Sequence, residues 1–336
     1  MPELSQPGGW LPLVFMGLMG LAMLIYVVLD GFDLGVGILL TRATDAQKDT
    51  MVASIGPFWD ANETWLVLGV GILLTAFPLA HGIILGELYL PVALMLGALI
   101  VRGVAFDFRV KARAAHKGAW NRAFFAGSLV ASLAQGVMLG RYVTGFGGGA
   151  LQWLFALFVG ASVAAGYALL GAAWLIIKTE GDLQRRAVRW ARASLWLTAG
   201  GIAAISIVTP LVSQRIFDKW FSYPNLIVLA PVPLFTAVLF GLVALSLRHL
   251  PATGERWVWV PFAGTVGVFV LAFLGLAYSM LPYLIVDRMT VWQGAAAPES
   301  LKVILVGALV VLPAIVFYTA YSYWVFRGKA RDLTYD

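Results

Sequence analysis

Two pairs of carboxylic acids lie in apolar surroundings, at a spacing suited to binding and passing protons. Asp30 and Asp33 are three residues apart, and so are Asp60 and Glu63, so each pair shares one face of a helix. Two carboxyl groups held this close raise each other's affinity for a proton. Charged groups inside a membrane are costly and face protein or internal water, which makes both pairs candidates for proton transfer.

The second pair has polar and aromatic neighbours. Asp60, Asn62 and Glu63 fall within four residues, flanked by Trp59 and Trp65. The start of a helix at this point would explain one acid, because its dipole favours a negative charge there. It does not explain three polar side chains directly before an uninterrupted apolar run, so we favour a functional role. For the first pair, a structural role near a helix end, bonding loop amides, stays equally open.

A positive charge also falls within the apolar sequence. Arg102 lies inside a predicted span, where a guanidinium needs an anion. Asp107 lies five residues further on, and a carboxylate on one of the first two helices is an equally good partner. We expect a structural ion pair, with Arg102 and Asp107 as its candidate residues. Glu87 and the adjacent Asp287 and Arg288 fall near the predicted outer surface, where we expect solvated or interfacial roles.

The chain has three histidines and no cysteine, which limits its metal chemistry. His81, His116 and His249 fall in predicted turns and loops, whereas a haem in a helical bundle usually takes at least one intramembrane histidine. We therefore expect no haem or metal to be bound by this chain itself. Hydrolase and nucleotide chemistry are disfavoured too, since the sequence lacks both an HExxH motif and a Gly-rich phosphate loop beside a strand.

The elements that must position these residues are membrane helices. Of the 336 residues, 61% are hydrophobic and 12% are charged, which nearly excludes a soluble domain. A helix needs about 20 apolar residues to cross about 30 Å of hydrocarbon. We therefore expect an all-α integral membrane protein with a single transmembrane domain, 1–336. The nine predicted spans are 11–40, 56–77, 83–108, 122–144, 151–177, 193–212, 225–247, 257–281 and 301–326.

The basic residues predict how these helices are oriented. The net charge of +6 is explained by basic loops on one side of a membrane, and we expect no nucleic-acid partner. Apart from Arg102 within a span, 17 basic residues fall on one predicted side, and the other side keeps 5. This asymmetry predicts an N-terminus outside and a C-terminus in the cytoplasm. The five residues on the outer side are Arg141, Arg215, Lys219, Arg288 and Lys302.

Three motifs in order carry a resemblance to a known family. They are Asp30-Gly-Phe-Asp-Leu-Gly-Val-Gly37, Gly-Pro-Phe-Trp59-Asp60-Ala-Asn62-Glu63-Thr-Trp65 and Arg102-Gly-Val-Ala-Phe-Asp-Phe-Arg109. Together they closely resemble subunit II of cytochrome bd-type quinol oxidases. Met289-Thr-Val-Trp292 extends the resemblance toward the C-terminus, so that it covers essentially the whole chain. The chain is short for this family and resembles the branch described as cyanide-insensitive oxidases.

The resemblance implies a complex in the bacterial cytoplasmic (inner) membrane that oxidises quinol and reduces dioxygen to water. The haems, b and d or b alone, would belong to a haem-bearing subunit I. The resemblance also allows a small accessory subunit and a bound lipid or quinone. Subunit II in this family is linked to the delivery of protons and oxygen and to the stability of the complex.

The motifs also imply roles for individual residues. Asp60 is implied as the acid of the proton pathway, and Trp65 as a residue near the oxygen entrance. Glu63 stands where some relatives carry a neutral amide, so its role as a second proton carrier is an open question. The residues implied to surround the polar route are Trp59, Asn62, Asp30 and Asp33.

Two other functions are compatible with the same acids. A proton-coupled secondary transporter would use Asp30, Asp33, Asp60 and Glu63 as coupling acids and would be active as a lone protein. A purely structural scaffold would use them only to hold helices together. Substitution of each acid by its amide separates the scaffold from a proton relay.

Overall fold

The structure is a computed structural model that describes residues 8–250 and 255–330. Residues 1–7 and Arg331, which entered the prediction of topology, lie outside the described residues. The prediction of an all-α membrane protein is confirmed, since eight helical segments in the described residues are long and apolar enough to cross a membrane. They are formed by α1 (Leu11–Leu39), α5 (Tyr89–Lys111), α6 (Ala114–Val143), α7 (Ala150–Lys178), α8 (Gly181–Val212), α11 (Pro231–His249), α12 (Val260–Met280) and α14 (Pro298–Val325).

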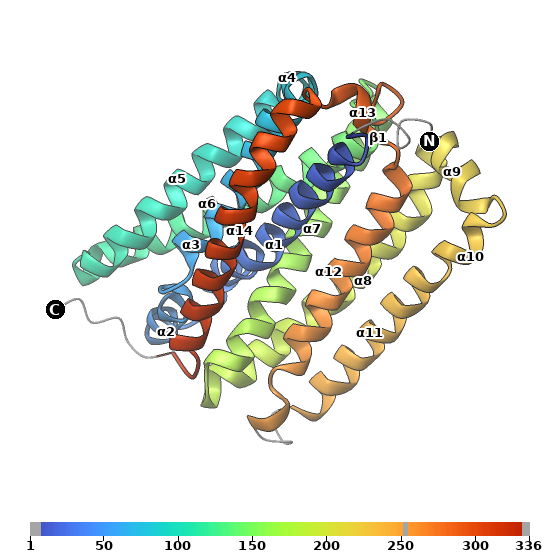
Figure 1. Ribbon diagram of the computed structural model, residues 1–336. Helices are drawn as coiled ribbons and strands as arrows, with labels where there is room; N and C mark the ends of the chain where they lie inside the picture. The colour runs from blue at the N-terminus through green and yellow to red at the C-terminus, as the bar shows by residue number, and fades with distance from the viewer. Residues whose placement is uncertain (1–7, 251–254, 331–336) are drawn as a thin grey trace.

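Apart from α3, the remaining elements are short and lie mainly at the ends of the bundle (Figure 1). They are η2 (Leu40–Arg42), α2 (Asp45–Ile55), α3 (Trp59–Ala76), α4 (Pro78–Glu87), α9 (Gln214–Phe221), α10 (Asn225–Leu229), η3 (Glu255–Trp257), β1 (Tyr283–Ile285), β2 (Met289–Thr290) and α13 (Val291–Gly294).

Helix α3 (Trp59–Ala76) corresponds to the predicted span 56–77, which is not among these eight segments. It has 18 residues, but its first turns carry Asp60, Asn62 and Glu63, so it is less apolar than the eight other segments. Such a helix needs protein on its polar side, because hydrocarbon offers no partner for charged groups. Helix α3 packs against α1, which supplies part of that cover.

Helix α1 lies in the middle of the bundle, with α3, α6 and α7 as its main neighbours (Figure 1). The glycines of its last turns allow an unusually close approach to α7. A Cβ atom on Gly35 would lie 1.8 Å from the carbonyl oxygen of Tyr167, and one on Gly171 would lie 2.4 Å from the carbonyl carbon of Gly35. Any larger residue at Gly35 or Gly171 would therefore push these two helices apart. The close packing buries the face of α1 that carries Asp30 and Asp33.

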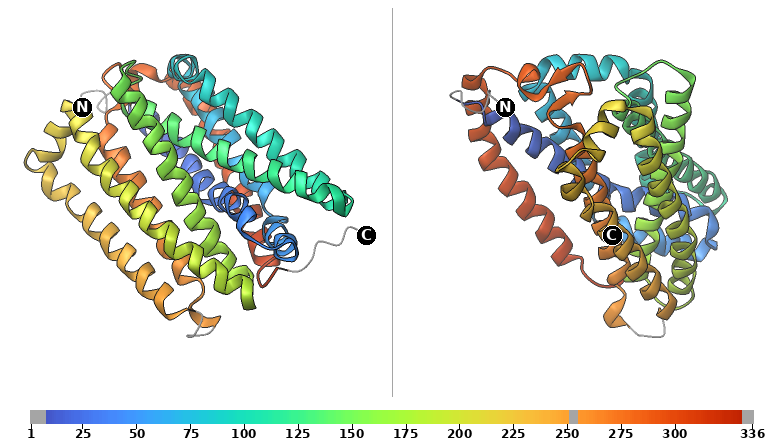
Figure 2. Two further views of the ribbon diagram at one scale, coloured as in Figure 1. Left: turned by 180° about the vertical axis from the view of Figure 1, so that it is seen from behind. Right: turned by 90° about the vertical axis from the view of Figure 1, so that its right-hand side faces the viewer.

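The two ends of the bundle carry different segments (Figures 1 and 2). The described N-terminus, α4, α9, β1 and α13 lie at one end, and α2, the α7–α8 turn and the end of α14 lie at the other. Helix α14 runs along the outside of the bundle, and none of its apolar window is buried. An outside N-terminus and a cytoplasmic C-terminus remain predictions.

Three details differ from the elements predicted from the sequence. The predicted span 83–108 is interrupted near Leu88, where α4 ends and α5 begins. Helix α8 starts at Gly181, twelve residues before the predicted span 193–212, because its polar first turns continue the same helix. A small antiparallel hairpin of β1 and β2, with Asp287 at a positive φ of 57° in its turn, was not predicted. Two strands this short leave no period-2 pattern to detect.

Candidate functional site

The centre of the candidate site is a buried ion pair between α1 and α5. The Nη1 atom of Arg102 lies 2.5 Å from the Oδ1 atom of Asp30, and each side chain is 1% exposed. The guanidinium also lies over the ring of Trp59, with its carbon 5.7 Å from the ring centroid. Arg102 thus has the anion that its place in a span requires, and it joins a helix of the first motif to a helix of the third.

Glu63 of α3 adds a second carboxylate to Arg102. Its Oε1 atom lies 3.5 Å from the Nη2 atom of Arg102, and its side chain is 27% exposed. Glu63 therefore connects the buried pair with the partly exposed side of α3.

Asp33 holds a separate chain of hydrogen bonds. The Nδ2 atom of Asn62 donates to the Oδ2 atom of Asp33 at 2.8 Å and to the carbonyl oxygen of Leu29 at 3.4 Å. The hydroxyl of Tyr323 on α14 donates to the Oδ1 atom of Asn62 at 3.0 Å. Asn62 is thus fixed by bonds at both ends of its amide, and it joins α1, α3 and α14.

Three residues that the sequence did not single out extend this polar region toward α6 and α7. The Nε2 atom of Gln135 donates to the hydroxyl oxygen of Tyr26 at 2.7 Å, and the hydroxyl of Tyr167 donates to the Oε1 atom of Gln135 at 2.6 Å. Tyr26 lies one helical turn before Asp30, on the same face of α1. An isolated glutamine within the apolar sequence of α6 was the signal that could have pointed to this branch.

The two remaining residues of the second motif differ in burial. Trp65 is buried, and it packs with Ala22 and Tyr26 of α1. Asp60 is exposed on the outer face of α3, and it has no hydrogen-bond or ion-pair partner in the part of the chain that the structure describes. The structure therefore groups Asp30, Glu63 and Arg102 closely, and it places Asp60 at the edge of this group, one helical turn from Glu63.

The predicted pairing of Arg102 with Asp107 is not what the structure shows. Asp107 is exposed, and the carboxylates near Arg102 come from α1 and α3. The reason is helix geometry, because residues five apart are about 140° apart around a helix axis and do not face each other.

The charges near the predicted outer surface form their own pairs. Arg288 lies 3.0 Å from Glu87, and Arg141 lies 4.0 Å from the same carboxylate. Asp287 lies 2.6 Å from Arg215 of α9. These pairs tie the β1–β2 hairpin to its neighbours at the bundle end, in keeping with an interfacial role.

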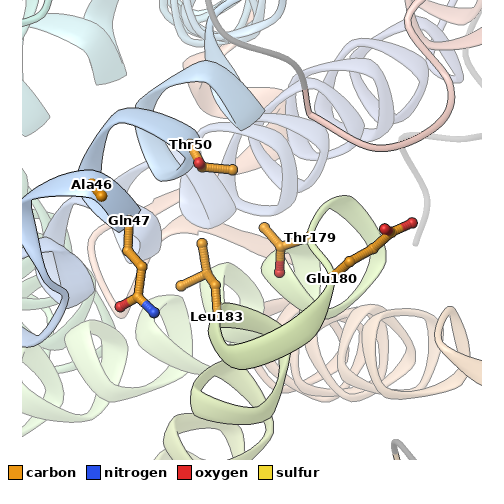
Figure 3. A pocket seen from close by; sticks show the side chains of 6 residues that line it. All are labelled: Ala46, Gln47, Thr50, Thr179, Glu180 and Leu183. Carbon is orange, nitrogen blue, oxygen red and sulfur yellow. The ribbon is translucent and has the colours of Figure 1, made fainter.

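None of the three histidines is buried in the described chain. His81 is half-buried in α4, and His116 and His249 are exposed near helix ends. A cavity of about 290 Å³ lies between α2 and the start of α8, and no residue of the carboxylate cluster lines it (Figure 3). Its lining consists of Ala46, Gln47, Thr50, Thr179, Glu180 and Leu183.

The fold and the site together define a multi-pass helical membrane protein that encloses a cluster of charges between its helices. Residues 11–326 match the family described as cytochrome bd terminal oxidase subunit II, and the chain belongs to that family. The sequence-based identification of the family is confirmed.

Named relatives and one solved structure agree with this membership. The chain is 28% identical over 359 residues to the cytochrome bd-I ubiquinol oxidase subunit 2 of Escherichia coli (strain K12), covering 93% of each chain. It is 28% identical over 328 residues to the cytochrome bd ubiquinol oxidase subunit 2 of Bacillus subtilis (strain 168), covering 90% of this chain and 92% of that protein. The bd oxidase structure from Geobacillus thermodenitrificans matches 94% of this chain and 99% of that chain, with a TM-score of 0.71 and 17% identity, and it supports the fold.

Proposed function

We propose that this chain is subunit II of a quinol:oxygen oxidoreductase in the bacterial cytoplasmic membrane, and that it carries protons from its surface toward a haem-bearing subunit I. Family membership and the names of the relatives support the first part of this proposal. The second part is carried by one observation, the excess of carboxyl groups around Arg102.

Three carboxyl groups share one guanidinium in this cluster. Asp30 and Glu63 lie beside Arg102, and Asp33 is fully buried on the same helix face as Asp30. If all three were ionised, two negative charges would be left without compensation in an apolar surrounding, which is strongly unfavourable. A proton held within the cluster removes one of these charges, so the arrangement favours proton binding.

The cluster also has atoms that are free to receive a proton or a water molecule. The Oδ2 atom of Asp30 and the Oδ1 atom of Asp33 are buried and lack a hydrogen-bond partner in the described structure. Buried polar atoms in proteins are nearly always bonded, so such atoms indicate a place for internal water or for a mobile proton. Asp60, at the edge of the cluster, is the acid from which a proton would pass to Glu63.

The face of α3 that carries Asp60 is proposed to bind subunit I. Thr64, Val67 and Leu74 follow Asp60 on this exposed face at helical spacing. A carboxylate at the start of such an apolar stripe is better covered by protein than by lipid. We place Trp65, directly behind this face, beside the path of oxygen.

The residues of this chain do not fit an intramembrane haem ligand, since its histidines lie near helix ends at exposed or half-buried positions. We therefore assign the haems, b with d or b alone, to subunit I, where they would supply the site of oxygen reduction. Quinol is the substrate of the complex, and a small accessory subunit is compatible with this assignment.

The test uses Asp60→Asn in the purified complex. Asparagine keeps the size of aspartate and can still form hydrogen bonds, but it cannot titrate. We expect the haem content and the reduction of haem by quinol to stay at the wild-type level, while oxygen uptake per haem falls about tenfold or more. Asp107→Asn is the matched control, because Asp107 is also an exposed acid, on α5.

The results separate the proposed function from its alternatives. Wild-type oxygen uptake per haem in Asp60→Asn would contradict the relay through Asp60, and Glu63→Gln would then be the next variant to measure. Proton-coupled transport by the chain alone, reconstituted without a haem protein, would favour a secondary transporter and contradict the subunit assignment.

A further inference from the structure

A second charged site lies between α2 and the start of α8. A cavity of about 410 Å³ is lined by Thr44, Gln47, Asp182, Arg185, Arg186 and Arg189. It shares Gln47 with the neighbouring cavity of Figure 3, in which Gln47 and Thr50 face Leu183 and Thr179. Three of its six lining residues are arginines, and none of the four sequence motifs that carry the family resemblance includes them.

Two of these arginines keep an uncompensated charge. Arg185 pairs with Asp182 at 2.5 Å, which neutralises the single acid of the lining. Arg186 donates to the carbonyl oxygen of Arg42 at 3.4 Å, and within residues 8–250 and 255–330 neither Arg186 nor Arg189 has a carboxylate at ion-pair distance. The cavity therefore keeps two positive charges, which favours an anion.

The neutral side of the cavity also offers donors. The backbone N–H of Thr44 donates to the Oε1 atom of Gln47 at 3.3 Å, which leaves the NH₂ group of Gln47 available to a ligand. Helix α2 is held in place by Arg109, which donates to Asp49 at 2.7 Å, and by Trp174, which donates to the carbonyl oxygen of Ser54 at 3.1 Å. Donors on a fixed helix and guanidinium groups on α8 thus face a common space suited to phosphate oxygens.

An apolar surface on α8 continues from the arginines. Trp196 follows Arg189 by seven residues and Leu197 follows Arg186 by eleven, so around the helix axis Trp196 lies about 20° from Arg189 and Leu197 about 20° from Arg186. Both side chains are 66% exposed. A free phosphate would not use this surface, whereas an acyl chain attached to the phosphate would lie along it.

The position of the cavity relative to the apolar part of α8 agrees with a lipid ligand. The apolar part of α8 begins near Ala193, which is four residues, or about 6 Å, after Arg189. The headgroup region on each side of a bilayer is about 5–8 Å thick. We propose that this cavity binds the phosphate of an anionic phospholipid, with an acyl chain along Trp196 and Leu197.

The test is a titration of the delipidated protein, purified in detergent with the subunits that accompany it. Phosphatidylglycerol, phosphatidylcholine and inorganic phosphate are each added, and bound lipid is counted by native mass spectrometry. The variant is Arg186→Gln with Arg189→Gln. The matched control is Arg113→Gln with Arg122→Gln. It removes two exposed arginines that do not line the cavity, one directly before α6 and one within it.

We expect the wild-type protein to bind phosphatidylglycerol in preference to phosphatidylcholine. The cavity variant should bind it about thirtyfold more weakly, the change that about 1 kcal/mol per basic side chain corresponds to. The control should stay within about twofold of the wild type. The variant Arg186→Lys with Arg189→Lys keeps the charge and should retain part of the affinity, which separates loss of the site from misfolding.

Three results would each overturn the proposal. Equal weakening of phosphatidylglycerol binding in the control variant would show that the basic surface attracts anionic lipid without a specific site. Unchanged binding in the cavity variant would place the lipid elsewhere. Displacement of phosphatidylglycerol by millimolar inorganic phosphate would show a free-anion site that does not use the apolar surface.

Discussion

Replacing Arg102 with methionine removes the guanidinium between Asp30 and Glu63 while keeping a long side chain in its place. The carboxylate of Asp30 would then be buried without a counter-charge, since its side chain is 1% exposed. Removing one partner of a buried ion pair typically costs about 3–5 kcal/mol. The loss of Glu63's contact adds little, because that carboxylate is 27% exposed and 3.5 Å away.

A double substitution tests whether this cost comes from the pair itself. Arg102→Met combined with Asp30→Asn removes both charges, so most of the lost stability should be recovered. The coupling free energy between the two substitutions should reach up to about 3 kcal/mol. We expect the temperature of half-inactivation of the purified complex to fall by roughly 5–10 °C in Arg102→Met and to recover in the double variant. The yield of assembled complex should follow the same order.

Arg113→Met is the control, since Arg113 is exposed at the start of α6 and has no carboxylate partner in the described chain. It should melt like the wild type. An Arg102→Met complex with wild-type yield and melting temperature would refute the reasoning, and so would a double variant less stable than both single variants. Normal assembly with abolished turnover would instead make Arg102 a group of the reaction path.

Three further predictions concern α14, the topology and the haem. Tyr323→Phe removes the hydroxyl that donates to Asn62 and should lower stability by about 1 kcal/mol, measured by thermal melting, with haem content unchanged. A reporter fused after the C-terminus should be active on the cytoplasmic side, and activity confined to the outside would contradict the asymmetry of basic residues. The chain expressed without subunit I should show no stoichiometric Soret band in its visible spectrum, because its histidines lie near helix ends.

Much of the fold could be predicted because membrane helices leave a strong signal in sequence. Eight of the nine predicted spans correspond to helices long and apolar enough to cross a membrane. Helix α3 was found through its apolar second half and its motif, although Asp60 and Glu63 reduce its hydropathy. The break near Leu88 was not predicted, because the sequence around Glu87 and Pro91 is otherwise mostly apolar and suggests one continuous span.

The candidate site could be predicted only in part, because partners depend on how helices rotate about their axes. The sequence indicated that Arg102 needs an anion, but the choice of Asp30 follows from the packing of α6 against both α5 and α1, which brings the two side chains together. In the chain Tyr26–Gln135–Tyr167, Gln135 is 109 positions from Tyr26 and 32 from Tyr167, and no local pattern marks such contacts. The sequence grouped Asp60 with Glu63 because both lie on one helix face. In the structure Asp60 is exposed, whereas Glu63 is partly buried beside Arg102.

The charge balance of the cluster argues for a role beyond packing. A single carboxylate would satisfy Arg102, and apolar residues of similar size often stabilise a protein as well as a buried ion pair does. Asp33 and Glu63 are therefore acids beyond the one that Arg102 needs as a counter-charge. Their cost is reduced when the cluster holds a proton, and it rises again when that proton leaves. A group whose charge changes at each transfer, next to an exposed acid on a face proposed to meet subunit I, has the properties that a stepwise proton relay requires.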